Sequence, residues 1–141
     1  MPLSSEELVR RLVARHRPDE IAYFDEVTAL LYDNPEAMYA GVGENEPLAA
    51  ELGVLLVVLI PVLYSALNDL ARDAAVAAGV RARRGIRLWL HKGEDAPQPL
   101  DPQRRAEAKQ TLVKRLRARD VPADEALQIA EEFLADLSGT P

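Results

Sequence analysis

The chain has 141 residues, 48% of them hydrophobic and 28% charged, and this length suits one domain with a core of its own. The net charge of −6 argues against a general nucleic-acid-binding protein, and the absence of cysteine excludes disulfides, thiolate metal sites and a cysteine nucleophile. Ala, Leu, Arg and Glu dominate the composition, which favours helix. We therefore expect an all-α fold of about five helices.

Two amphipathic helices are predicted in the first 33 residues. Ser4 or Ser5 can cap the first helix, whose apolar stripe consists of four residues, Leu8, Val9, Leu12 and Val13. Pro18 should end this helix, because proline disfavours helix in the residue before it, and it can begin a second helix. The apolar positions of the second helix recur at helical spacing at Ile21, Phe24, Val27, Leu30 and Leu31.

An uncharged stretch, residues 52–68, is the most apolar part of the chain. A helix that is apolar on all sides must be buried, either in protein or in lipid. Pro47 suits a first helical turn and Gly79 suits a helix end, so we predict one long central helix over residues 48–78, bent at Pro61. The residues expected to face the membrane or the core are Leu52, Leu55, Leu56, Val58, Leu59, Val62 and Leu63.

The remaining sequence divides into three segments. Residues 81–92 form a basic collar, predicted as a short amphipathic helix, whose members are Arg81, Arg83, Arg84, Arg87, Trp89 and Lys92. Residues 93–102 contain three prolines and form a linker, so the collar closes a first region over residues 1–92. A helical hairpin is predicted over residues 103–139, in which a basic first helix and an acidic second helix pack antiparallel with complementary charges.

Two interpretations of the central helix stay open. Residues 48–67 contain one acidic residue, and a membrane span needs about 17–25 largely apolar residues. Lys and Arg are absent from the twenty residues before this stretch and number six in the next twenty-five, which places the C-terminus in the cytoplasm. The collar would then contact anionic lipid. The alternative is a soluble cytoplasmic bundle, in which residues 52–68 form the core or a homo-oligomer interface.

The sequence contains no motif that specifies a reaction. His16 and His91 each lie among arginines, which disfavour a bound metal, and no phosphate-binding glycine motif or nucleophile motif occurs. We therefore predict no catalytic residue, cofactor or metal. The expected function is that of a small, non-enzymatic interaction or scaffold protein, anchored in a membrane through residues 48–67, which binds a protein partner or self-associates. The alternative is a soluble subunit that docks a partner through acidic and basic faces.

Overall fold

The computed structural model describes residues 4–33, 57–77, 96–97 and 101–138. The regular elements of these residues are all helical, which confirms the predicted all-α class. In chain order they are α1 (Ser5–His16), the 3-10 helix η1 (Pro18–Tyr23), α2 (Phe24–Asp33), α4 (Leu59–Ala77), α5 (Pro102–Ala118) and α6 (Ala123–Leu137).

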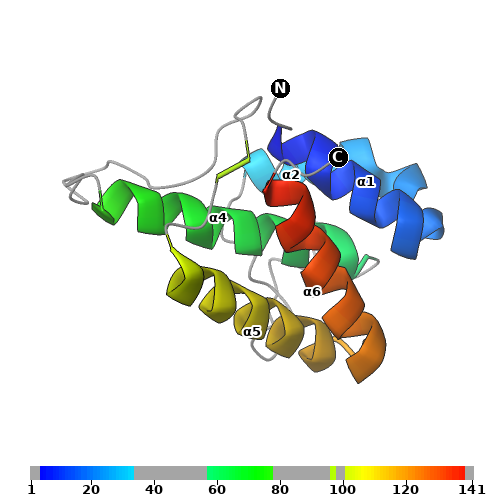
Figure 1. The fold of residues 1–141 in the computed structure, drawn as a ribbon. Coiled ribbons are helices and arrows are strands. Elements are labelled where there is room, and N and C mark those ends of the chain that lie inside the picture. The colour runs from blue at the N-terminus through cyan, green and yellow to red at the C-terminus, as the bar shows by residue number, and fades with distance from the viewer. Residues whose placement is uncertain (1–3, 34–56, 78–95, 98–100, 139–141) are drawn as a thin grey trace.

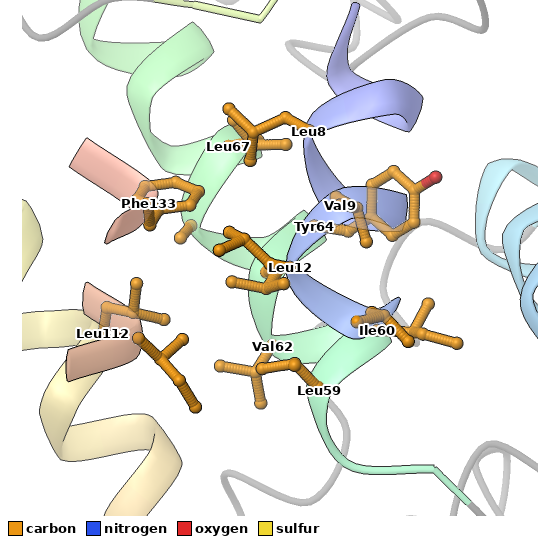
Figure 2. Packing of buried hydrophobic residues seen from close by; sticks show 14 of the residues in the cluster. Leu8, Val9, Leu12, Leu59, Ile60, Val62, Tyr64, Leu67, Leu112 and Phe133 are labelled. Atoms are coloured by element: carbon orange, nitrogen blue, oxygen red, sulfur yellow. The ribbon is translucent and has the colours of Figure 1, made fainter. Parts of the chain in front are cut away.

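Four of the helices enclose a common core. Helix α4 packs against α1 and against α5, and α6 packs against the same two helices, so that the four close a ring (Figure 1). Helix α2 adds to this ring by packing against α4, and η1 packs against α1. Figure 2 shows apolar side chains of all four ring helices meeting in the middle, including Leu12, Val62, Leu112 and Phe133.

Helix α1 follows the sequence prediction. Ser4 is its N-cap, and a capping box joins the Ser4 hydroxyl to the backbone N–H of Glu7 at 3.1 Å and the Glu7 carboxylate to the backbone N–H of Ser4 at 3.3 Å. The four predicted stripe residues are fully buried in the core. The helix ends before Arg17, and Pro18 begins the next element, because proline disfavours helical geometry in the residue that precedes it.

The second predicted helix is divided into two elements, which corrects the expectation of one continuous helix from Pro18. Residues from Pro18 to Tyr23 adopt the tighter 3-10 geometry, and the α-helical hydrogen-bond pattern begins at Phe24. The 3-10 segment carries Glu20, which is only 5% exposed and lies against the start of α4. Phe24, Val27 and Leu31 are buried, as their spacing predicted.

The predicted central helix over residues 48–78 is wrong at its start. Helix α4 begins at Leu59, and residues 48–56 lie outside the described residues. Pro61 is consequently the third residue of the helix and does not bend its middle. The first N–H groups of a helix have no partner within it. Proline lacks an N–H, so at this position it breaks no hydrogen bond of the helix.

The apolar residues of α4 are buried by the protein itself. Of the residues predicted to face membrane or core, Leu59, Val62 and Leu63 are buried in the common core, and Val58 is half-buried beside it. Leu52, Leu55 and Leu56 lie outside the described residues. Over residues 4–33, 57–77, 96–97 and 101–138, no helix combines the length and the apolar character needed to cross a membrane.

The last two helices are joined by a tight turn. The Asp101 side chain caps α5 by accepting from the backbone N–H of Arg104 at 2.8 Å. Asp120, with φ of 66°, reverses the chain after α5, in a left-handed conformation that Asp tolerates better than most residues. The residues of the predicted linker and hairpin also reach the common core, which includes Ala96, Leu112 and Phe133. The predicted division into three segments stays a prediction.

Candidate protein interaction surface

Arg115 of α5 and Arg119, which caps the end of this helix, fasten α5 to α4 and to the chain just before it. Arg115 lies with its guanidinium 2.8 Å from the carboxylate of Asp69 and donates to the Ser65 hydroxyl at 3.0 Å. Arg119, one turn further on, donates to the backbone carbonyl of Val57 at 2.9 Å. Burial lowers the pKa of Arg119, and the nearby carboxylate of Glu20 opposes that effect. The inward-facing positive charges of α5 are thus held by groups of the protein.

The acidic residues of α6 pair mainly with α1. Glu132 accepts a hydrogen bond from Arg15 and lies 3.0 Å from Nε2 of His16, while Glu125 pairs with Arg17. Burial raises the pKa of Glu132, but the hydrogen bonds from Arg15 and His16 outweigh burial and hold that pKa below its usual value. This arrangement joins the end of α1 to the outer side of α6.

The charge complementarity predicted between the two hairpin helices is therefore only partly present. Lys109 and Glu131 lie 4.0 Å apart across the α5–α6 pair, at the limit of an ion pair. The physical reason is that α6 packs against both α5 and α1, so Glu132 and Glu125 pair with Arg15 of α1 and with Arg17, which follows it. Several basic residues of α5 consequently remain on the surface.

These basic residues border an open groove of about 770 Å³ on the outer side of α5 and α6. We call it the α5–α6 groove, and its lining residues are Ala106, Lys109, Gln110, Val113, Lys114, Arg117, Ala118 and Leu127. The apolar residues of the groove come from both helices, whereas all three cations come from α5. The groove therefore combines an apolar surface with positive charge.

Leu127 is the largest apolar group in the groove, and it is 43% exposed. Ile129, Phe133 and Leu137 define the buried stripe of α6, and Leu127 falls at the edge of that stripe, beyond the cover of α5. An exposed leucine at this position is what gives the groove its apolar character.

Lys114 and Arg117 are both exposed, and neither forms an ion pair with any residue that the structure describes. A surface cation without an ion-pair partner stays hydrated, so its position costs little free energy. It still attracts an approaching carboxylate over about a Debye length, ~8 Å at physiological salt. The two residues are three positions apart on α5, so they lie on the same side of the helix. They give the groove a positive border.

A second pocket, of about 260 Å³, lies between α4 and α5, and its charges are of both signs. Asp69 in this pocket is held by Arg115, and Arg104 lies 3.4 Å from Glu107. Because these groups satisfy one another, the pocket offers less to a charged partner than the α5–α6 groove does. No cluster of three or more side chains suited to hold a metal occurs in the described part of the chain.

The basic collar predicted from the sequence lies entirely outside the described residues. Its members are Arg81, Arg83, Arg84, Arg87, Trp89 and Lys92. The α5–α6 groove was missed, although the sequence contained one signal for it, since residues 103–119 carry seven basic residues and a single acidic one. That excess showed that α5 is basic, but which of its charges reach solvent depends on how α6 and α4 pack against it.

Comparisons with protein-family models, with curated proteins and with solved structures find no match for this chain.

Proposed function

We propose that this protein is a non-enzymatic helical interaction domain that binds a protein segment in the α5–α6 groove. The observation that carries the proposal is the exposure of Leu127 beside Lys114 and Arg117, two cations that form no ion pair with the described residues. Scattered apolar residues are common on protein surfaces, but an apolar groove bordered by one sign of charge is typical of a binding site. The ligand that fits is a segment with an apolar stripe and acidic flanks.

The physical contributions to such binding are unequal. Covering Leu127 and the half-buried Val113 removes apolar surface from water, at roughly 25 cal/mol per Å². Exposed ion pairs add only about 0.2–1 kcal/mol each, but they orient the ligand and accelerate its approach. An amphipathic helix laid along a groove satisfies both requirements, since one face is apolar and its edges can carry carboxylates.

Of the two interpretations left open by the sequence, the bundle is the one we propose. Its support is the burial of Leu59, Val62 and Leu63 by the other helices, which gives the apolar stretch a protein environment. The membrane location predicted through residues 48–67 stays a prediction, because residues 48–56 lie outside the described residues. Contact of the basic collar with anionic lipid stays a prediction for the same reason.

The test is a titration of the full chain with a labelled synthetic peptide, followed by fluorescence anisotropy. The peptide is an amphipathic helix with a leucine stripe flanked by glutamates, and its control carries lysine in place of each glutamate. We expect saturable binding of the acidic peptide only, weakened by added salt. Leu127→Ser and Lys114→Glu should each weaken binding about tenfold or more.

The matched control is Gln128→Ser, an exposed neighbour of Leu127 that does not line the groove and should leave binding unchanged. Equal binding of the acidic and the basic peptide would contradict the proposal. So would wild-type affinity in Leu127→Ser, because the groove would then not be the binding surface.

A further inference from the structure

The part of the chain that the structure describes has two large, exposed hydrophobic residues. One is Leu127 in the α5–α6 groove, and the other is Tyr23, which is 45% exposed at the end of η1. In the sequence, Tyr23 stands between Asp19 and the pair Asp25 and Glu26, and all three acidic residues are exposed. We call these four residues the η1–α2 patch. All four lie within residues 19–26, and the 3-10 helix that carries the first two rises about 2 Å per residue.

The η1–α2 patch carries three exposed carboxylates, one of which is paired with an arginine. Residues 18–33 contain five acidic residues and no Lys or Arg. Asp25 is paired with Arg10 at 2.8 Å, and Arg10 also lies over the ring of Phe24, with its Cζ 4.4 Å from the ring centroid. Asp19 and Glu26 form no ion pair with the described residues. Tyr23 is thus an exposed aromatic ring with an exposed carboxylate on either side of it in the chain.

The patch and the groove are opposite in charge and alike in having an exposed apolar centre. The groove presents Leu127 among cations, and the patch presents Tyr23 among anions. A tyrosine suits insertion into a groove, because its ring offers a large contact area and only two side-chain angles must be fixed. Its hydroxyl can stay at the rim, where the lysines and arginine of α5 are hydrated.

We propose that the chain associates with itself, the η1–α2 patch of one copy docking in the α5–α6 groove of the next. This inference rests on the proposed function of the groove and names its occupant as a second copy. The complementary surfaces bring the acidic residues Asp19 and Glu26 towards Lys114 and Arg117. Tyr23 then covers the apolar surface around Leu127.

The contact is between two different surfaces, so it is head-to-tail. Figure 1 shows η1 and α2 on the α1 side of the molecule, whereas α5 lies on the opposite side of α4. A patch therefore cannot reach the groove of its own copy. Each docked pair leaves one groove and one patch free, and such heterologous contacts give rings or open chains. The expected product grows with concentration instead of stopping at a closed dimer.

The test is sedimentation velocity of the full chain over a range of concentrations, with two double variants. The groove variant is Lys114→Glu with Arg117→Glu, and the patch variant is Asp19→Lys with Glu26→Lys. The average mass of the wild-type species should rise with protein concentration and fall when salt is added. Each variant alone should associate about tenfold more weakly or worse, because like charges would then face each other.

Mixing the two variants gives the decisive result. The patch variant keeps an intact groove and the groove variant keeps an intact patch, so the mixture should associate although neither variant does so alone. The two exchanged surfaces are also opposite in charge, so they can form a second contact between the copies. The four exchanged residues, Asp19, Glu26, Lys114 and Arg117, are all exposed, so circular dichroism should confirm unchanged helicity before mixing. The acidic peptide should dissociate the wild-type assembly by occupying the groove.

Three outcomes would overturn the inference. These are a mixture that stays monomeric, a wild-type assembly unaffected by either variant, and a patch variant that still assembles with itself. A chain that is monomeric throughout but binds the acidic peptide would overturn self-association and leave the proposed function standing. A chain that neither assembles nor binds the peptide would contradict both.

Discussion

The carboxylate of Glu20 holds the first backbone N–H of α4, that of Leu59, at 3.1 Å from Oε1 and 3.2 Å from Oε2. It also accepts from the N–H of Val58 at 3.1 Å and from that of Ile60 at 3.4 Å. The first N–H groups of a helix lack partners within it, and the helix dipole places partial positive charge there. A residue from η1 therefore supplies the N-terminal cap of the most apolar helix.

Replacing Glu20 should be costly because three N–H groups depend on it. Glu20→Ala should lower the free energy of unfolding by about 2 kcal/mol, since hydrogen bonds to charged groups contribute ~1.5–3 kcal/mol. Urea denaturation followed by circular dichroism measures this loss. The neighbouring Asp19 is exposed, so Asp19→Ala should change stability by less than about 0.5 kcal/mol. Equal effects of the two substitutions would contradict the capping role.

Thr28 and Tyr64 form a buried hydroxyl pair, with the two oxygens 3.1 Å apart. The ring of Tyr32 meets that of Tyr64 edge to face at 5.8 Å, and burial raises the pKa of Tyr64, although the hydrogen bond with Thr28 opposes this. Thr28→Val or Tyr64→Phe alone should cost about 1–2 kcal/mol, because each leaves one buried hydroxyl unpaired.

The double variant provides the control for this prediction. Thr28→Val with Tyr64→Phe removes both hydroxyls, so it should be less destabilised than the sum of the single variants. Equilibrium unfolding of the four proteins measures the difference. Strictly additive losses would show that the two hydroxyls do not act as a pair.

Acid should remove the contribution of Glu132. Its pKa in the folded protein is below the ordinary value of 4.5, so its stabilising effect is present above that value and is lost as pH falls through the folded-state pKa. Wild-type protein should therefore be more stable than Glu132→Gln at about pH 6, by roughly 1 kcal/mol, and the two should converge as the pH falls below the folded-state pKa.

Unfolding of both proteins in urea at several pH values measures this convergence. Glu131→Gln is the matched control, because Glu131 is an exposed neighbour whose only described ion pair, with Lys109, spans 4.0 Å. We expect little difference between Glu131→Gln and wild type at any of these pH values. A gap between wild type and Glu132→Gln that persists in acid would rule out the ion pair as its cause.

Local patterns in the sequence predicted the helices and much of the core. The stripe of Leu8, Val9, Leu12 and Val13 is buried as its period required, because helical spacing depends on neighbouring residues alone. The start of α4 could not be predicted in this way. It is set by Glu20, a residue 39 positions before Leu59, and no local pattern reports such a contact.

The candidate site was harder to predict for the same reason. The excess of basic residues in residues 103–119 was visible, but the sequence did not show that Arg115 and Arg119 turn towards α4 while Lys114 and Arg117 stay exposed. Charge pairing between the hairpin helices was expected from their opposite composition. Packing of α6 against α1 redirected its acidic residues, which only the three-dimensional arrangement reveals.

The central claim is that α4 forms the core of a protein bundle and that Leu127 belongs to an open groove. Its most direct test is urea unfolding of Leu63→Ala and Leu127→Ala in buffer without detergent. Leu63 is fully buried, so its truncation should cost about 2–5 kcal/mol, whereas truncation of Leu127 should cost less than about 1 kcal/mol. Cooperative unfolding with that difference is the predicted result. Equal losses, or a chain that stays folded only in detergent, would contradict the account.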